Sequence, residues 1–250
     1  MGRDLYDMLL SRARADAPVR RMLLGLSWSV CQVEAVGVCF SPRDVPRTLS
    51  WSGTLRGRSS AELVPWVRSF DAAQACVGAS VINALINRGD NALQRRAQAL
   101  ALAVPAHLQV FAHFAPQLQR AEAVTVIGRY PGLERLWSGL NYRCLERCPG
   151  PDTLPDTAAE QVLPRSEWVF ITGSAIANHT LPRLLELSRE ASVVLMGPSV
   201  PWLEDWAELG VDYLAGCEVT DTEALFATAA EAGGTRIFET GLRYRLASLA

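Results

Sequence analysis

The sequence lacks the features that mark several large classes of protein. No apolar run reaches the roughly 20 residues of a transmembrane helix, and the amino terminus carries charges where a signal peptide has its apolar core. The basic residues form no continuous stripe and the net charge is -2, which disfavours nucleic acid as an electrostatic partner. We therefore expect a cytoplasmic protein with neither a membrane nor a nucleic acid as its partner.

Metal-binding and disulfide patterns are also absent. No CxxC pair occurs among the six cysteines, so neither a zinc ribbon nor a disulfide framework is indicated, and most are expected to be small buried residues. His107 and His113 are six positions apart, whereas two ligands on one helix face are spaced four apart. A metal site, if present, must use residues that are distant in sequence.

The composition is that of an ordered protein with one large or two small domains. Hydrophobic residues make up 49% of the 250 residues and charged residues 20%. The pattern changes near Ala123, so we place one domain at residues 1–120 and another at residues 121–250.

The first domain is expected to be α+β. Two apolar runs, residues 22–30 and 33–40, predict antiparallel strands, and residues 49–55 extend this sheet. Residues 72–87 predict a buried helix capped by Asp71, and residues 91–103 predict a further helix.

Two features of this domain are candidate ligand contacts. Asn83 lies inside the buried helix, where an amide must be hydrogen-bonded, so it either fixes nearby loops or reaches a ligand. The segment Trp51 to Gly57 has glycines at 53 and 57, which suit either an ordinary turn or a loop that approaches a ligand closely.

The second domain is expected to be a doubly wound parallel sheet. Apolar runs at residues 168–171 and 193–196 flank an amphipathic segment at 180–190, which predicts a βαβ unit with a right-handed crossover. Small polar residues follow each run, at the carboxyl edge where open α/β sheets bind ligands. A last strand is expected near residues 235–238.

Glu146 ends the second strand expected in this domain, residues 142–146, and stands 18 positions after Gly128. An acidic residue at that place holds the ribose hydroxyls in nucleotide-binding folds. The G-x-G-x-x-G turn is missing, so a dinucleotide is disfavoured while a smaller ligand stays open. The alternative is a surface ion pair between Glu146 and Arg147.

The loops at residues 172–174 and 197–199, and the start of the helix expected at Thr180, complete the candidate site. Their hydroxyl and amide groups could bind an anion at the amino terminus of that helix. The alternative is that Asn178 and Thr180 only cap the helix. The candidate ligand-binding residues are Trp51, Gly53, Gly57, Asn83, Gly128, Glu146, Thr172, Gly173, Ser174, Asn178, Thr180, Gly197, Pro198 and Ser199.

Eight ordered segments resemble one known family. They are GLSW at 25–28, WSGTLRG at 51–57, GASVINA at 78–84, VIGRYP at 126–131, LERCP at 145–149, ITGSAIANHTL at 171–181, MGPSVP at 196–201 and GVDYLAG at 210–216. In this order they are similar to the bacterial and archaeal family of putative heavy-metal chelation domain proteins. The resemblance implies an enolase-N-terminal-like α+β domain, a Rossmann-like domain and a site between them.

Two functions are open on this basis. The first is binding of a metal ion, or of a metal-containing or anionic small molecule, within cofactor or metallophore metabolism. A divalent transition metal would take ligands from Glu146, Cys148, His179 and Cys217. The second is a Rossmann-class enzyme acting on a nucleoside-like or other small anionic substrate.

Other functions have less support from the sequence. Serine hydrolysis is disfavoured because His179 alone among the three histidines lies in the candidate region and no nucleophile elbow is visible, and no catalytic residue is assigned. A purely structural or partner-binding module would be supported if side chains filled the space at the carboxyl ends of the strands, so that no cleft remained there. The seven tryptophans are compatible with either a homodimer or an ordinary core.

Overall fold

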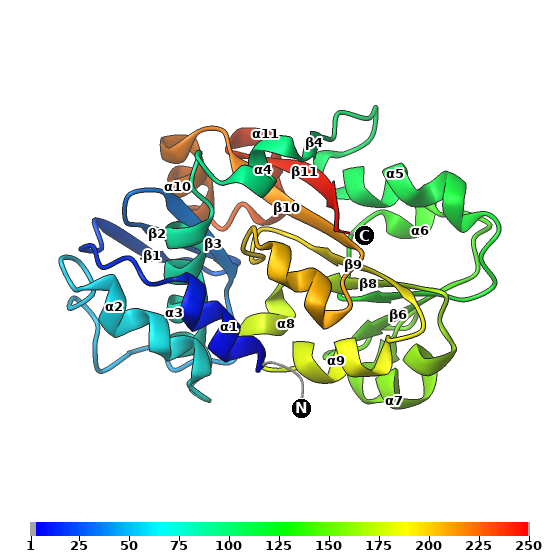
Figure 1. The fold of residues 1–250 in the computed structure, drawn as a ribbon, viewed down its shortest axis with the longest axis horizontal. Helices are drawn as coiled ribbons and strands as arrows, with labels where there is room; N and C mark the ends of the chain where they lie inside the picture. Colours follow the sequence, from blue (N-terminus) through cyan, green and yellow to red (C-terminus); the bar gives the residue numbers. More distant parts are fainter. Residues whose placement is uncertain (1–3, 250) are drawn as a thin grey trace.

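The computed structural model describes residues 4–249 and contains two sheets (Figure 1). The small antiparallel sheet has the order β1 (Arg21–Leu24), β2 (Trp28–Gln32) and β3 (Val36–Phe40). The large sheet has the order β4 (Gln98–Ala99), β11 (Leu242–Ser248), β10 (Tyr213–Val219), β9 (Ser192–Met196), β8 (Trp168–Thr172), β5 (Val124–Ile127), β6 (Tyr142–Glu146) and β7 (Leu154–Pro155).

Helices connect and cover these strands. The α-helices are α1 (Leu5–Arg12), α2 (Ser60–Leu63), α3 (Ala72–Ile86), α4 (Ala92–Arg96), α5 (Gln109–Leu118), α6 (Leu133–Leu136), α7 (Ala159–Val162), α8 (Ser174–Ala177), α9 (Leu181–Leu187), α10 (Thr222–Ala230) and α11 (Ile237–Thr240). Short 3₁₀ helices are η1 (Val64–Arg68), η2 (Ala106–Leu108), η3 (Asp156–Ala158), η4 (Leu163–Arg165), η5 (Glu204–Leu209) and η6 (Gly234–Arg236).

The small sheet packs on α3. Asp71 begins this helix as expected, since its carboxylate accepts a hydrogen bond from the Gln74 amide at 3.0 Å. Gly37 of β3 allows close packing, because a Cβ there would lie 2.1 Å from the Ser80 carbonyl oxygen and 2.2 Å from the Ala84 nitrogen. The helix backbone therefore lies directly against the strand.

The large sheet has parallel strands from β7 through β10, and β11 and β4 are antiparallel at one edge. Its central strands are apolar on both faces. In β8, Phe170 packs with Phe111 and Phe114 of α5, whereas Val169 and Ile171 pack in the core that includes α7 and α9. This gives the three-layer α/β architecture, because strands covered on both faces need an uninterrupted apolar sequence.

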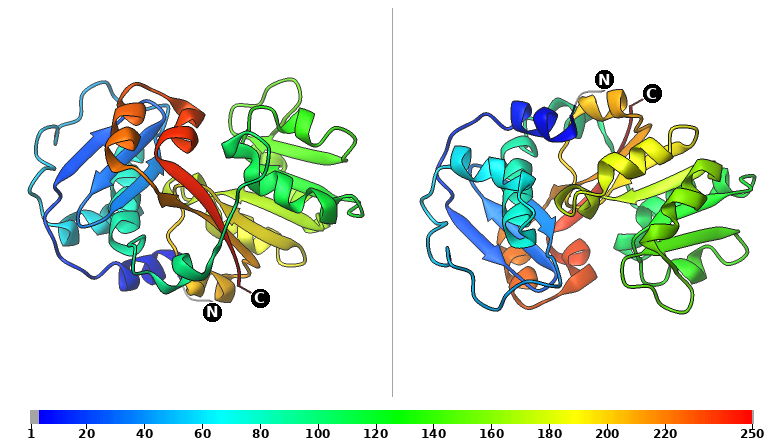
Figure 2. Two further views of the ribbon diagram at one scale, coloured as in Figure 1. Left: turned by 90° about the horizontal axis from the view of Figure 1, so that it is seen from above. Right: turned by 90° about the horizontal axis from the view of Figure 1, so that it is seen from below.

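The two sheets are joined by the carboxyl-terminal part of the chain. Helix α10 packs against β1 and β2, although it follows β10 of the large sheet. Figure 2 shows α10 and α11 beside the small sheet, with β10 and β11 running between the two lobes. The division into domains at residue 120 stays a prediction, as do the enolase-like and Rossmann-like assignments.

Four expected elements differ in the structure. Residues 22–30, expected to form one strand, contain most of β1, a turn at residues 25–27 and the start of β2. Residues 49–55 form successive turns, with the Ser52 amide bonded to the Leu49 carbonyl, so they do not extend the small sheet. Residues 91–103 contain the short α4 and then β4, because pairing with β11 and a 3.1 Å bond from Arg245 Nε to the Ala97 carbonyl override the local helix propensity.

The last strand was also expected too early. Residues 235–238 form η6 and the start of α11, and Ile237 and Phe238 are buried. The strand is β11, in which Leu242, Tyr244 and Leu246 are the inward residues. Buried apolar residues alternate with arginines in this segment, which is the pattern of a strand. The expected strand was instead placed on the apolar pair Ile237-Phe238.

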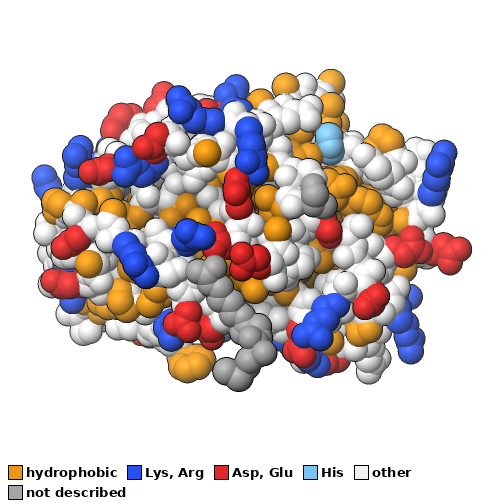
Figure 3. Space-filling view, viewed as in Figure 1, with side chains coloured by type: hydrophobic (Ala, Val, Ile, Leu, Met, Phe, Trp, Pro, Cys, Tyr) orange, Lys and Arg blue, Asp and Glu red, His pale blue; other side chains and the backbone are white. Residues whose placement is uncertain are grey.

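The surface has mixed charge. On the face in Figure 3, basic side chains lie beside acidic ones. The ion pairs of the chain include Arg96 with Glu204 at 2.8 Å and Arg68 with Asp4 at 3.2 Å. Within residues 4–249, no helix combines the length and apolar character that a membrane crossing requires.

We predict that Gly37→Ala destabilises the protein by at least the ~1–3 kcal/mol typical of an overpacked core, because the atoms in the way are helix backbone. Gly89→Ala is the control, since its Cβ would meet no atom within 4 Å. Urea unfolding of both variants measures the difference. Equal stability of the two would contradict the close packing of β3 on α3.

Candidate functional site

A cleft of about 780 Å³ lies at the carboxyl ends of the parallel strands, where they face the small sheet. It spans the boundary between β5 and β8. The strands β6 and β7 lie on one side of β5, whereas β8, β9 and β10 lie on its other side. Such a switch in strand order is the usual position of the ligand in open α/β sheets. The strand-end residues that line it include Gly128, Glu146, Thr172, Gly173, Gly197 and Ser199.

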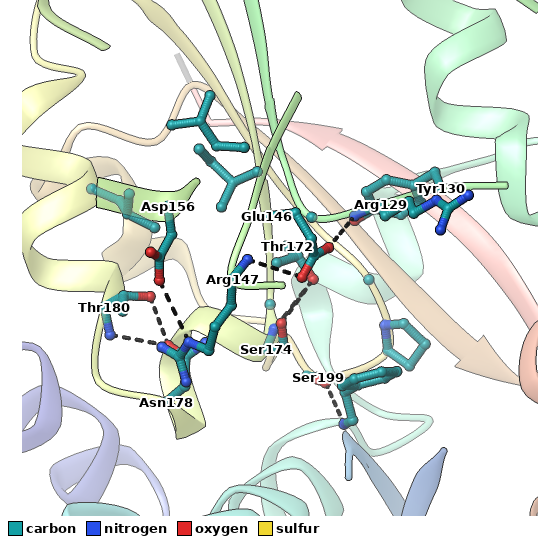
Figure 4. A pocket seen from close by; sticks show the side chains of 18 of the residues that line it. Arg129, Tyr130, Glu146, Arg147, Asp156, Thr172, Ser174, Asn178, Thr180 and Ser199 are labelled. Carbon is teal, nitrogen blue, oxygen red and sulfur yellow. Dashed lines mark hydrogen bonds and ion pairs between the residues drawn. The ribbon is translucent and has the colours of Figure 1, made fainter. Parts of the chain in front are cut away.

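Glu146 is held in a defined orientation at the end of β6 (Figure 4). Its Oε2 accepts a hydrogen bond from the Arg129 amide at 2.9 Å, and its Oε1 accepts one from the Arg147 amide at 3.1 Å. Gly128 turns the chain after β5 with a φ of 99°, a conformation that favours glycine, and this turn directs the Arg129 amide toward Glu146. A carboxylate has about four lone-pair positions, so two remain for a ligand.

Thr172 and Ser174 lie next to this carboxylate. Their hydroxyl oxygens are 3.2 Å apart, and Figure 4 shows Glu146 and these two side chains pointing toward one another. Gly173 lies between them, where a Cβ would be 2.4 Å from a Val200 methyl group. The result is a floor of one carboxylate and two hydroxyl groups at the ends of β6 and β8, the two strands that flank β5.

The segment after α8 has strained backbone and internal hydrogen bonds. Asn178 Oδ1 accepts from the Thr180 amide at 3.1 Å and from its hydroxyl at 2.6 Å, while neither side chain caps α9. His179 has a φ of 63°, rare for a residue with a Cβ, and its Nε2 lies 2.9 Å from the Ser69 carbonyl oxygen. Asn178 and Thr180 therefore support the loop that carries His179, between the rings of Tyr6 and Phe70.

The loop after β9 joins the cleft to the small sheet. Gly197 has a φ of 114°, and Pro198 and Ser199 follow it in buried positions. The Ser199 hydroxyl accepts a hydrogen bond of 2.9 Å from the Phe40 amide at the end of β3. This bond sets the distance between the two walls of the cleft.

Another wall of the cleft is aromatic and is built from the small sheet, α11 and β11. Trp28 contacts Phe40 edge to face with ring centroids 5.2 Å apart, and Phe238 stacks on Tyr244 at 4.9 Å. All four residues line the cleft. Burial raises the pKa of Tyr244 well above its ordinary value, and burial also raises that of Tyr130, so both phenols stay protonated.

Arginines supply the fixed positive charges of the cleft. Arg147 lies 3.5 Å from Asp156, and Arg183 donates hydrogen bonds to Glu160, which raises the pKa of the guanidinium. Within residues 4–249, no acidic side chain forms an ion pair with Arg43 or Arg129, which also line the cleft. These two side chains are the ones available to an anionic ligand.

Four predicted ligand residues do not line this cleft. Trp51 and Gly53 lie along a separate groove beside β1, and Gly57 lines neither cavity. Asn83 is fully buried, and its amide donates a hydrogen bond of 2.8 Å to the Val38 carbonyl. Of the two roles considered for Asn83, the structure shows the one in which it fixes the adjoining strand.

The four candidate metal ligands are not brought together. Glu146 and His179 line the cleft, whereas Cys148 is exposed outside it and Cys217 is buried beside it. Burial raises the pKa of the Cys217 thiol well above its ordinary value, which disfavours the thiolate that a metal needs. In the part of the chain that the structure describes, no three His, Cys, Asp or Glu residues form a group that could hold a metal ion.

Sequence reasoning missed the aromatic wall. Trp28, Phe40, Phe238 and Tyr244 come from four separate segments, so no local spacing relates them. Trp28 alone carried a signal, as part of the GLSW segment, and the exposed fraction of 38% at Phe40 shows that its ring remains accessible.

Comparison with known families gives two matches that share one description, putative heavy-metal chelation. One covers residues 111–248 and the other residues 6–86. No protein of curated function matches the chain.

Two solved structures are similar over nearly the whole chain. A protein of unknown function from the DUF364 family of Desulfitobacterium hafniense DCB-2 is 27% identical, with a TM-score of 0.83, covering 98% of this chain and 96% of that one. A second, from Pyrococcus horikoshii, is 21% identical, with a TM-score of 0.77 and 97% coverage of each chain. The second likeness concerns the fold alone.

We predict that Asn178→Ala lowers the free energy of unfolding by about 1 kcal/mol, because two hydrogen-bond donors of Thr180 lose their acceptor. Asn178→Asp retains the oxygen and should stay close to the wild-type value. Thermal unfolding of both variants provides the measurement. If alanine were as stable as aspartate, Asn178 would not support this loop.

Proposed function

The chain belongs to the putative heavy-metal chelation family, and from this premise we propose that its cleft binds a small organic molecule that itself chelates the metal. The protein then recognises the chelator or its metal complex, and we place it in cofactor or metallophore metabolism. The single observation that carries the proposal is a ligand-sized cleft without a metal-binding group of three His, Cys, Asp or Glu residues in residues 4–249.

The donor atoms of the cleft favour this proposal over a bare ion. Its floor offers the oxygens of Glu146, Thr172 and Ser174, which suit hard cations, whereas heavy transition metals favour nitrogen and sulfur ligands. His107 and His179 both line the cleft, and one ring nitrogen of each already faces a backbone carbonyl, that of Pro131 and that of Ser69 respectively. A chelating molecule would bring the missing ligands with it.

The size and walls of the cleft also fit an organic molecule. Its volume of about 780 Å³ lies within the ~300–1,000 Å³ range of small-molecule sites. The aromatic wall of Trp28, Phe40 and Phe238 can pack on a planar ring, and Glu146 can accept hydrogen bonds from hydroxyl or amine groups.

A negative group on the molecule would be bound by Arg43 and Arg129. The sequence has no lysine, so its 24 basic residues are all arginines, which keep their charge and can bind a carboxylate in bidentate fashion.

The direct test is native mass spectrometry with elemental analysis of protein purified without a metal-affinity tag. We expect an organic mass and a metal in equal amounts, lost together on mild denaturation. Glu146→Gln should weaken retention about 10- to 100-fold, since hydrogen bonds to a charged group contribute roughly 1.5–3 kcal/mol.

Glu134→Gln is the matched control, because Glu134 is an exposed carboxylate on α6 outside the cleft, and it should retain both components. A metal held without an organic mass, and lost in Glu146→Gln, would show direct coordination in the cleft and contradict the proposal.

A second candidate, a Rossmann-class enzyme for a nucleoside-like substrate, is favoured by one observation. The parallel strands follow the order β7-β6-β5-β8-β9-β10, which corresponds to the 3-2-1-4-5-6 order of nucleotide-binding sheets. Glu146 then occupies the end of the second strand, where an acidic residue accepts from the ribose hydroxyls. The absence of lysine leaves this chain no side chain for a lysine Schiff base.

Calorimetry with adenosine and 2′,3′-dideoxyadenosine tests this candidate. If Glu146 binds a vicinal diol, adenosine should bind at least ~10-fold more tightly, a difference of about 1.4 kcal/mol, and Glu146→Gln should remove the preference. Equal affinity of the wild-type protein for both compounds would contradict a ribose-binding role.

A further inference from the structure

Tyr244 is the more deeply buried of the two tyrosines that line the cleft. Only 2% of its surface is exposed, and Phe238 stacks on its ring with centroids 4.9 Å apart. In β11 it lies opposite Cys217 of the neighbouring strand β10. These contacts fix the ring in the wall of the cleft, and they leave the hydroxyl group without an assigned role.

The Tyr244 hydroxyl group has no hydrogen-bond partner among the described residues 4–249. Tyr6, the other buried tyrosine of this range, donates a hydrogen bond of 2.9 Å to the Ile176 carbonyl oxygen. A buried tyrosine hydroxyl group usually has such a partner. The Tyr244 hydroxyl group therefore differs from the ordinary case.

The unpaired oxygen of Tyr244 is accessible from the cleft. Among residues 4–249, one side-chain nitrogen or oxygen is fully buried without a partner, and that atom is Oε1 of Gln94. Because the Tyr244 oxygen also lacks a partner, it must retain some accessible surface, and this side chain lines the cleft. A group that enters the cleft can thus accept a hydrogen bond from it.

The surroundings of this hydroxyl group favour an uncharged partner. Phe238, which stacks on Tyr244, also meets Trp28 edge to face with centroids 6.4 Å apart. Burial raises the pKa of the Tyr244 phenol well above its ordinary value, because a negative charge is poorly solvated there. A carboxylate of a ligand would be penalised in the same way, whereas a neutral carbonyl group would lose far less solvation.

We propose that the Tyr244 hydroxyl group donates a hydrogen bond to a carbonyl oxygen on a planar ring of the ligand, and that this ring packs along Trp28 and Phe238. A carbonyl oxygen projects from its ring and carries two lone pairs, so it can reach a hydroxyl group that is almost entirely covered. Because this ring belongs to the organic molecule of the proposed function, the role of Tyr244 rests on that function. The molecule then has hydroxyl or amine groups at Glu146 and a ring carbonyl at Tyr244.

The stability of Tyr244→Phe separates this role from a structural one. The hydroxyl group has no partner within residues 4–249 to lose, so Tyr244→Phe should unfold at the same urea concentration as the wild-type protein. Tyr6→Phe removes the hydrogen bond to Ile176 and should unfold at a lower concentration. If Tyr244→Phe were as destabilised as Tyr6→Phe, the hydroxyl group would support the fold, and the proposal would be overturned.

Three probes of similar size test the binding itself. Acetophenone has a neutral carbonyl group on its ring, ethylbenzene has no polar group, and benzoate has a carboxylate. Each is titrated into wild-type protein and Tyr244→Phe that were unfolded in urea and refolded, so that no retained molecule occupies the cleft. The NMR signal of the Trp28 indole N–H reports binding, because Trp28 lines the cleft.

We expect Tyr244→Phe to weaken the binding of acetophenone about 2- to 10-fold, which is the contribution of one neutral hydrogen bond. Its affinity for ethylbenzene and for benzoate should equal that of the wild-type protein. Tyr213→Phe is the matched control, because Tyr213 of β10 lies outside the cleft, and it should bind all three probes as the wild-type protein does.

Three results would overturn the role of Tyr244. They are no binding of acetophenone by the wild-type protein, equal binding of acetophenone by Tyr244→Phe, and a loss in Tyr244→Phe that is larger for benzoate than for acetophenone. None of them bears on the metal analysis of the proposed function. Conversely, a metal bound directly by Glu146 would contradict that function whether or not Tyr244 binds the carbonyl probe.

Discussion

The cleft depends on a set of hydrogen bonds that fasten the loop after β9 to the small sheet and α3. Ser199 accepts from the Phe40 amide, and the Asn87 side chain at the end of α3 donates to the Val200 carbonyl and accepts from the Trp202 amide. These groups are largely buried, where an unpaired donor or acceptor costs about 1–3 kcal/mol, so the loop cannot leave its place easily. The parallel sheet alone would present its carboxyl edge to solvent. Because that edge is fastened to the small sheet, it forms one wall of a cleft.

The chemistry of the two walls differs, and this difference underlies the proposed function. The strand ends provide oxygen atoms around Glu146, and the aromatic wall provides the rings of Trp28 and Phe40. Under the proposed function, this site would recognise a molecule by its shape and its hydroxyl or amine groups, and atoms of that molecule would bind the heavy metal.

The sequence predicted those parts of the site that depend on local order. Apolar runs followed by small polar residues identified the ends of β8 and β9, and the spacing from Gly128 identified Glu146 at the end of β6. Contacts between distant segments could not be found in this way. The hydrogen-bond partner of Asn83, the Val38 carbonyl, is 45 positions away, so the sequence left the role of this buried amide open. The pairing of β4 with β11 likewise joins segments nearly 150 positions apart. The residues of the aromatic wall are likewise brought together only by folding.

Crystals of protein purified without a metal-affinity tag, measured at the absorption edge of the metal that elemental analysis identifies, test the central claim most directly. We predict an anomalous peak in the cleft whose ligands belong to a bound organic molecule, with Glu146 contacting that molecule. An anomalous peak bonded directly to Glu146 and His179, with no organic density around it, would contradict this account.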